Sequence, residues 1–257
     1  MQARAIIALG LFIGAQGIGI QAAAQESRAF PALFGAPSAV APPGKSGYVA
    51  LHLVTPRRDR PGLSIGDDPD GDMGFGYTIG NPVDSISLSA HVLITSLTDA
   101  FGDSGGLAFD LSRVLVQGES GLVFASLSAG NIAAWGDAKA DPENYTATVS
   151  YLTDLPAAGG DLPLQFSLSY GTDSTYKRSG RVAGRNLYSL EDGFIAGVGI
   201  GLTRNLSASI SATATQYNIG IGVTHDALPN WGLSAGFYDV ANAVERRQLA
   251  VSLSRGF

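Results

Sequence analysis

The stretch LSASISATAT, residues 206–215, alternates along its whole length between apolar and small hydroxyl side chains. Successive side chains of a β-strand point to opposite faces, so the stretch predicts a strand with one apolar face and one Ser/Thr face. The wet face of a soluble sheet usually carries Lys, Glu and Arg instead. An apolar face backed by small polar residues is typical of a barrel with lipid outside and water inside.

Two further stretches show the same alternation. Residues 85–95 place Ile, Leu, Ala, Val and Ile on one face and Ser, Ser, Ser, His and Thr on the other, with Leu93 as the exception. Residues 194–203 alternate Phe, Ala, Val, Ile and Leu with Ile, Gly, Gly, Gly and Thr. These lengths suit the ~9–11 residues that a tilted strand needs to cross a membrane, whereas strands of soluble proteins usually have ~5–6.

We predict an all-β fold, an antiparallel transmembrane β-barrel of about 12 strands. The strands are expected at residues 47–55, 73–81, 85–96, 105–113, 120–128, 144–152, 162–171, 193–203, 205–215, 217–225, 231–239 and 247–257. Counts of ten or fourteen stay open, because a period of two is a weak signal in any one strand. The sheet is expected to close, because an open edge would leave backbone groups unpaired in lipid.

The predicted connections differ in length between the two ends of the barrel. Short links fall at residues 81–84, 204–205 and 226–230, and longer, more polar links fall at 56–72, 129–143, 172–192 and 240–246. With both chain ends in the periplasm, the short links lie mainly on the periplasmic side and the longer ones outside, as in bacterial barrels.

The first 24 residues have the order of an export signal. Arg4 gives a positive start, residues 5–12 are apolar, and Ala22–Ala24 offer a small-residue cleavage site before Gln25. This order is typical of a secretory signal peptide, which we expect to be cleaved after residue 24. A membrane-anchoring helix is the alternative, which the glycines of the stretch disfavour.

Residues 25–46 are rich in Ala and carry four prolines. Clustered prolines interrupt regular structure. We therefore expect an irregular periplasmic lead-in without a core of its own, followed by the barrel at residues 47–257.

The composition suits a chain in contact with two solvents. Charged residues make up 15 % of it, against ~25 % in soluble domains. It has no cysteine, which excludes disulfides and thiolate metal sites. The first 24 residues hold one Arg and no acid, so the mature part keeps 15 basic and 22 acidic residues, a net charge of −7. That charge argues against nucleic acid as a partner.

The last predicted strand ends in an aromatic residue. The odd-numbered residues from Leu249 to Phe257 share one face and are apolar except for Arg255, whose long side chain can reach the lipid headgroups. A terminal Phe on an alternating strand resembles the signal by which outer-membrane barrels are recognised by their assembly machinery. Phe257 is therefore the predicted assembly signal, and that machinery is a predicted partner.

Three Gly-rich stretches resemble a group of uncharacterised bacterial outer-membrane barrel proteins of porin-like type. They are GFGYTIGNP at 74–82, FGDSG at 101–105 and YNIGIGV at 217–223. With the strands between them, they cover most of residues 73–257. The resemblance implies a barrel in the outer membrane of a Gram-negative-type bacterium, in contact with lipid and lipopolysaccharide. It implies no activity and no ligand.

A polar pair is predicted inside the barrel. His91 lies on the Ser face of residues 85–95, and in a hairpin centred near residues 100–102 it sits across from Asp110 or Ser112. Such a His91–Asp110 pair could set ion selectivity or respond to pH near about 6–7. An ordinary polar pair that fills space is the alternative.

No enzyme activity is predicted. Twelve-stranded barrels include an outer-membrane phospholipase, and such chemistry needs a nucleophilic Ser beside a His. None of the three His residues is followed two positions later by Ser. We therefore expect no catalytic residue and no cofactor.

Residues 67–72 read Asp-Asp-Pro-Asp-Gly-Asp in the first predicted external loop. Asp68, Asp70 and Asp72 have the first, third and fifth positions of a calcium loop. Met73 stands where the loop needs Gly, and Ile79 where it needs Glu. We predict weak Ca²⁺ binding at most, with an acidic, solvated loop as the alternative.

Charged and aromatic residues gather near the predicted strand ends. Basic clusters comprise Arg57, Arg58 and Arg60, and Lys177, Arg178, Arg181 and Arg185. They could contact lipopolysaccharide phosphates or an anionic solute, or be ordinary solvated loop charge. The aromatic residues are Tyr48, Trp135, Tyr145, Tyr188, Trp231, Tyr238 and Phe257. They suit interfacial girdles, with scattered core aromatics as the alternative.

Two functions fit this pattern. The first is a small porin-like channel for passive diffusion of small solutes, because inward Gly, Ser and Thr leave the lumen of a 12-strand barrel less filled. The second is a plugged barrel that acts as a binding, adhesion or polysaccharide-export and assembly component through its external loops. Residues 173–192 form the longest candidate for a plug or a binding loop.

Overall fold

The computed structural model describes residues 31–41, 44–55, 70–95, 97, 101–182, 185–244 and 247–257; at residues 70, 178, 180–182 and 185–188 it describes the backbone alone. The predicted signal peptide, residues 1–24, lies outside this range. The described residues form twelve strands: β1 (Ser46–Val54), β2 (Asp70–Gly80), β3 (Ser87–Ile94), β4 (Gly105–Gly118), β5 (Gly121–Trp135), β6 (Asn144–Leu155), β7 (Leu162–Val182), β8 (Arg185–Gly201), β9 (Leu206–Thr213), β10 (Tyr217–His225), β11 (Leu228–Tyr238) and β12 (Gln248–Gly256).

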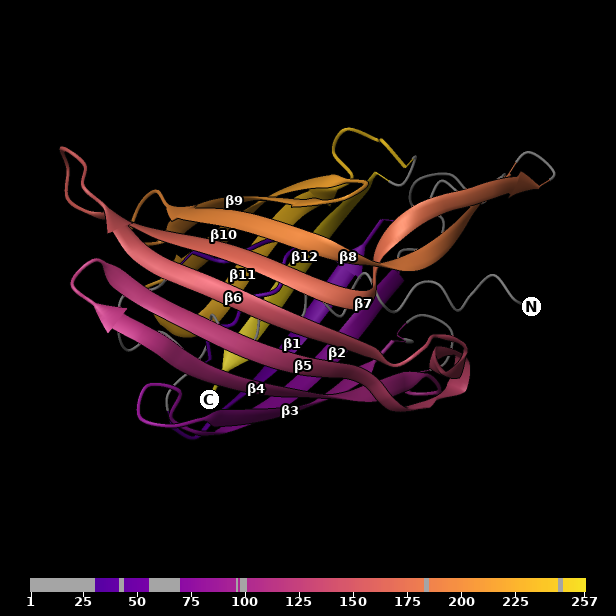
Figure 1. The fold of residues 1–257 in the computed structure, drawn as a ribbon, viewed down its shortest axis with the longest axis horizontal. Coiled ribbons are helices and arrows are strands. Elements are labelled where there is room, and N and C mark those ends of the chain that lie inside the picture. The colour runs from indigo at the N-terminus through magenta and orange to yellow at the C-terminus, as the bar shows by residue number, and fades with distance from the viewer. Residues whose placement is uncertain are drawn as a thin grey trace.

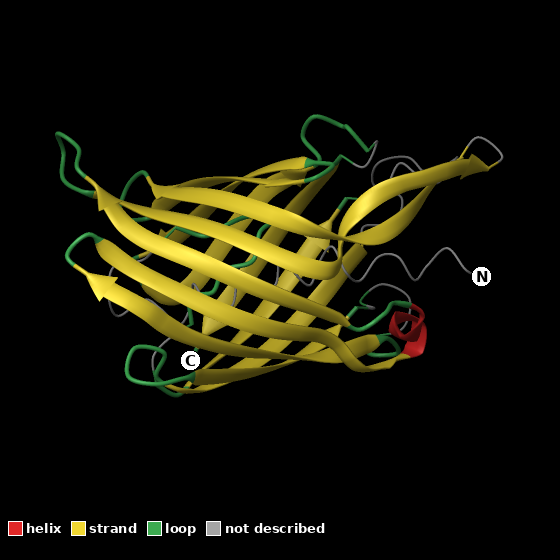
Figure 2. Ribbon diagram, in the orientation of Figure 1, coloured by secondary structure: helices red, strands yellow, loops and turns green. Residues whose placement is uncertain are grey.

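The strands close into a single antiparallel barrel. Each strand pairs with its neighbours in sequence, and β1 pairs with both β2 and β12. Figure 1 shows the strands tilted and side by side around the barrel, and Figure 2 shows that most of the described chain is strand. The predicted fold and the count of twelve are therefore confirmed, and each predicted strand overlaps an observed one.

The two ends of the barrel differ, as the sequence predicts. At the end that holds Ser46 and Phe257, β4 is joined to β5 through 119–120 and β10 to β11 through 226–227. At the other end lies a short 3-10 helix, η2 (Gly136–Ala140). We call these the periplasmic end and the external end. No helix in the described part of the chain combines the length and apolar character needed to cross a membrane.

The link predicted at 172–192 is a hairpin instead of a loop. β7 and β8 run on beyond the barrel wall, with pairing that extends to Val182 and Arg185. Figure 1 shows this hairpin projecting past the other strands. The register shifts between Gly171 and Thr175, where the hairpin leaves the wall. Beyond the membrane both faces of a hairpin can be polar, so the apolar alternation that identifies the other strands is missing there.

A belt of large apolar side chains surrounds the barrel. Each strand contributes at least one that is exposed: Leu53, Phe75, Leu88, Leu111, Leu127, Val149, Leu168, Phe194, Ile210, Ile221, Leu233 and Leu253. Monomeric soluble proteins do not expose apolar surface on this scale, whereas a barrel in lipid requires it. The fold is therefore that of a transmembrane barrel.

Candidate functional site

The inner wall of the barrel is lined by small polar side chains. Hydroxyl residues that face inward and are buried occur on nine of the twelve strands: Thr78, Ser87, Ser89, Ser112, Ser126, Thr148, Ser150, Ser167, Ser169, Ser211, Ser234, Ser252 and Ser254. This face is the Ser/Thr face that the alternation predicts. Its burial shows that other parts of the chain cover the inward face. The sequence offers a plugged barrel only as the second alternative, with residues 173–192 as the candidate plug.

Residues 31–41, which we call the lumen segment, occupy the inside of the barrel. The segment is irregular, as predicted for the lead-in, but it lies within the wall and not outside it in the periplasm. It enters near the periplasmic end, where the N–H of Gly44 donates to the carbonyl of Gly80 at 2.9 Å. Its Phe34 packs against Val54 and Ala250 near the external end. The segment therefore crosses much of the height of the lumen.

Wall side chains satisfy the backbone of the lumen segment. Ser211 and Ser167 donate to the carbonyls of Phe34 and Pro37 at 2.8 and 2.6 Å, and Ser112 donates to the carbonyl of Ala39. The N–H groups of Phe34 and Ala39 donate to Ser209 and Ser150 at 3.0 and 2.9 Å, and Gln165 donates to the Ser38 hydroxyl at 2.5 Å. Hydroxyls can both donate and accept, so a Ser-lined wall can hold an irregular chain.

Wall glycines make room for the segment. A Cβ at Gly220 would lie 2.4 Å from Cβ of Phe34, and one at Gly197 would lie 2.9 Å from Cβ of Ala36. Larger residues at these places would force the segment or the wall to shift. From sequence, the inward glycines are interpreted as leaving an open lumen. In the structure, Gly197 and Gly220 leave room for the lumen segment.

Three apolar clusters anchor the segment, and one of them joins Leu33 and Ala36 to Ile195 of β8. Phe34 packs with its ring 4.6 Å from that of Tyr238, beside Val54 and Ala250. Ala39 and Val40 pack on a cluster of wall residues nearer the periplasmic end, which consists of Val114, Phe124 and Leu152. These segment residues were missed from sequence. The signal for them is the presence of Leu33, Phe34 and Val40 in a stretch that is interpreted from sequence as an irregular periplasmic lead-in.

A row of polar residues lies behind Phe34. Ser234, Ser252, His52 and Asp72 are successive register partners on β11, β12, β1 and β2. The hydroxyl of Ser252 lies 2.5 Å from Nδ1 of His52. His52, Ser234 and Tyr238 also line one small cavity with Phe34. Within the described chain, Nε2 of His52, Oγ of Ser234 and the Tyr238 hydroxyl are buried without a hydrogen-bond partner.

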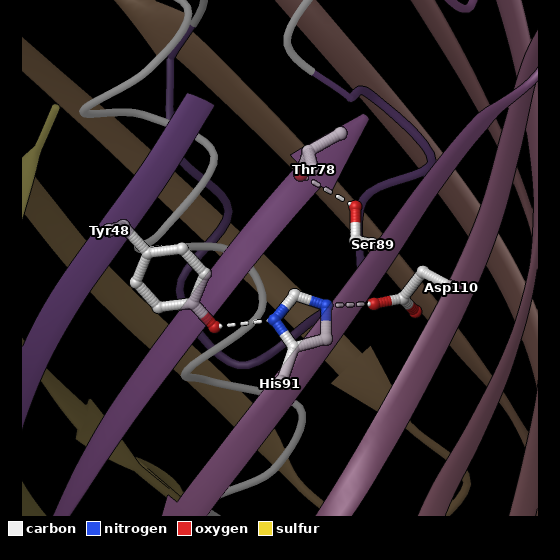
Figure 3. A network of polar contacts seen from close by, with 5 residues as sticks. All are labelled: Tyr48, Thr78, Ser89, His91 and Asp110. Carbon is white, nitrogen blue, oxygen red and sulfur yellow. Dashed lines mark hydrogen bonds and ion pairs between the residues drawn. The ribbon is translucent and has the colours of Figure 1, made fainter. Parts of the chain in front are cut away.

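A second polar network contains the predicted His91–Asp110 pair. Nε2 of His91 lies 2.6 Å from Oδ2 of Asp110, and its Nδ1 lies 2.9 Å from the hydroxyl of Tyr48 (Figure 3). The register pairs Asp110 with Ser89, one step along the same face, so the contact is diagonal. Figure 3 also shows the bond of 2.7 Å between Thr78 and Ser89. The predicted contact is present, and its role in selectivity or pH response stays a prediction.

The described charges that face the lumen are acidic. Asp72 and Asp110 point inward from β2 and β4, and no Lys or Arg among the described side chains does so. Arg255 faces outward, with its guanidinium 5.5 Å from the ring centre of Trp231. A cation over an aromatic face near a strand end suits the headgroup region.

The predicted calcium loop is only partly visible. The loop was expected to reach residue 72, but β2 already begins at Asp70. Asp72 is a strand residue that faces the lumen, whereas Asp68 lies outside the described residues. No group of three or more His, Asp or Glu side chains in the described chain is placed to hold a metal ion. Weak Ca²⁺ binding by Asp68, Asp70 and Asp72 stays a prediction.

The predicted aromatic girdle is wrong for two members. Tyr48 and Tyr238 face the lumen, because they share the inward parity of their strands. Tyr145 and Phe257 are exposed, at 52 % and 71 %. The side chain of Tyr188 and those of most of the basic clusters lie outside the described part. Lys177 is described, and it pairs with Glu191 at 2.9 Å on the hairpin.

Neither described Ser residue of a Gly-x-Ser-x-Gly pattern has a His side chain as its hydrogen-bond partner. The pattern Gly-x-Ser-x-Gly, found around the nucleophile of many hydrolases, occurs at 62–66, 102–106 and 232–236. The first lies outside the described residues. In the second, Ser104 bonds to Thr95 and to the N–H of Ala138. The third lies inside strand β11, where no sharp strand-to-helix turn presents the serine.

Comparison with known proteins gives similarity of architecture. No family model and no curated protein matches the sequence. Among solved structures, the KdgM porin matches 82 % of this chain and 99 % of its own at 11 % identity and a TM-score of 0.48. For an outer-membrane channel from Pseudomonas putida F1, the match covers 84 % of this chain and 97 % of the channel, at 11 % identity and a TM-score of 0.49. For the NanC porin, it covers 81 % of this chain and 98 % of the porin, at 7 % identity and a TM-score of 0.48. Such identities concern the barrel fold alone.

Proposed function

We propose that the protein is a small porin-like channel of the outer membrane, for passive diffusion of small solutes. The observation that carries the proposal is the contrast between the apolar outer face and the small polar inner face of the barrel wall. A ring of strands with an apolar outside encloses a lumen lined by hydroxyl and Gly residues, a lining suited to water. The segment that fills the lumen is separate from that wall.

The proposed solutes are neutral or positively charged. Asp110 places a carboxyl group on the lumen wall, where it contacts His91, and no Lys or Arg side chain among the described residues points inward. In a narrow pore such charges set which ions enter. We therefore expect cations to pass more readily than anions.

Conductance in planar lipid bilayers tests the proposal. The refolded full chain is compared with a variant that lacks residues 31–41, and heat-modifiable migration on gels establishes that both are folded. The shortened variant is expected to conduct steadily and at a higher level than the full chain. A folded shortened variant with no conductance would rule out a channel.

A second function is favoured by the projecting hairpin of β7 and β8. A filled barrel with a long external hairpin suits a binding, adhesion or polysaccharide-export component. Direct binding of lipopolysaccharide by the refolded protein tests this alternative. A hairpin shortened by removal of residues 176–190 should lose the binding and keep the fold, if the hairpin is the working surface.

A further inference from the structure

We propose that the lumen segment is a displaceable gate, which closes the channel in the structure and leaves the lumen as one unit about Gly44 when the channel opens. The proposal rests on the proposed channel function. It concerns residues 31–41 and the wall residues that hold them, and it predicts that the channel has a closed and an open state.

The barrel does not need the segment for its own integrity. All twelve strands pair with one another, and the lumen segment adds no strand to the sheet. The backbone pairing that lipid demands is therefore complete without it. Displacement of the segment leaves the hydrogen-bonded wall unchanged, which a gate requires.

The hydrogen bonds of the segment are of a kind that water can replace. The segment has the sequence PALFGAPSAVA, without a charged residue. In the described chain it is held by the six hydrogen bonds to Ser and Gln side chains and by the packing of a few apolar residues. Ser hydroxyls that release a peptide group can bind water in its place.

The wall behind the segment suits a wet lumen better than a permanent core. Nε2 of His52, Oγ of Ser234 and the Tyr238 hydroxyl are buried near Phe34 without a partner among the described residues. Buried polar atoms in a permanent core are almost always hydrogen-bonded, because leaving them unpaired is unfavourable. Withdrawal of Phe34 would open these three atoms to water.

A pivot lies where the segment joins the wall. Gly44 has a φ of +80°, and a Cβ at that position would meet nothing within 4 Å. One hydrogen bond, from its N–H to Gly80, fixes it to β2. The residue combines unusual backbone freedom with open surroundings, so the segment can turn there without disturbing β1.

A disulfide between segment and wall tests the gate. The chain has no cysteine, so the double variant Ala36→Cys with Gly197→Cys has no competing thiol. The two Cβ positions lie 2.9 Å apart, and a disulfide needs about 3.8 Å, so the segment has to shift by roughly 1 Å. Single-channel currents are recorded from the same preparation, oxidised and then reduced.

The oxidised variant is expected to stay closed, and reduction should raise the open probability at least tenfold. The double variant Thr148→Cys with Ser169→Cys is the matched control. These residues pair across β6 and β7 on the lumen face, next to Ser150 and Ser167, and the hydroxyl of Thr148 donates to that of Ser169 instead of to the lumen segment. Its open probability should be the same in both redox states.

Two results separate the gate from the channel. If the variant lacking residues 31–41 conducts and the Ala36/Gly197 variant is equally open when oxidised and reduced, the gate is wrong and the channel stands. The same conclusion follows if the shortened variant conducts and the full chain never opens. If the folded shortened variant is silent, the channel itself is wrong.

Discussion

Replacement of Phe34 by Ala gives the sharpest quantitative prediction. Phe34 is 7 % exposed, and its ring packs against Tyr238 at 4.6 Å and beside Val54 and Ala250. Removal of a buried Phe ring from a protein core costs about 3–5 kcal/mol. In the open state this ring lies in water, so the loss falls on the closed state alone.

The expected change in gating follows from the lower end of that range. Each 1.4 kcal/mol changes an equilibrium tenfold, so a loss of about 3 kcal/mol lowers the ratio of closed to open states on the order of a hundredfold. A channel that is closed about 99 % of the time would become open about half of the time. Single-channel recording of open probability in planar bilayers measures this change directly.

The matched control is Phe237→Ala. Phe237 precedes Tyr238 on β11 but faces outward and is 41 % exposed. Its loss removes an equal ring from the same strand without touching the lumen. Equal open probabilities for Phe34→Ala, Phe237→Ala and the unaltered protein would refute the assignment of Phe34 as the anchor of a gate.

Further variants test the wall, the charges and the terminus. Gly220→Val puts side-chain atoms where Phe34 packs, so the open probability of this variant should rise as in Phe34→Ala. An unchanged open probability would contradict the role of Gly220 in making room for Phe34. Asp110→Asn should lower the preference for cations, seen as a reversal potential nearer zero in a KCl gradient, and an unmoved potential would exclude Asp110 from selectivity. His91→Ala should flatten any change of conductance with pH; a profile identical to that of the unaltered protein would leave His91 as a space-filling residue. Removal of Phe257 should lower the fraction of heat-modifiable protein in the outer membrane, whereas normal yield would show that it is not the assembly signal.

The strands and the His91–Asp110 contact could be predicted because one constraint repeats along the chain. Lipid on one side and a small polar lumen on the other impose a period of two on each membrane-crossing strand. The alternation in a stretch such as residues 206–215 then indicates which of its side chains face the lipid and which face the lumen. His91 shares the parity of the inward Ser residues, so its contact with Asp110 follows from strand order.

The β7–β8 hairpin could not be predicted in this way. Its residues 172–192 lie beyond the lipid, where neither face has to be apolar. The interpretation of Tyr48 and Tyr238 as girdle residues was also wrong. Their place near strand ends suggested a girdle, but both lie on the inward face of their strands. Position along a strand is a weaker guide than position on its face.

The lumen segment was missed for a deeper physical reason. A wall of Ser and Gly is expected for a lumen filled with water, and the same wall binds a peptide backbone, because hydroxyls bond equally to either. A closed barrel offers no free strand edge, and Pro31 and Pro37 lack the N–H that a strand would need. Side chains alone can therefore hold a chain inside such a barrel. Each hydrogen bond of this kind contributes about 1 kcal/mol, so Ser-to-Ala changes at Ser112, Ser167 and Ser211 would loosen the segment in small steps. A wall built from many weak contacts thus allows the closed state to be stable and still reversible.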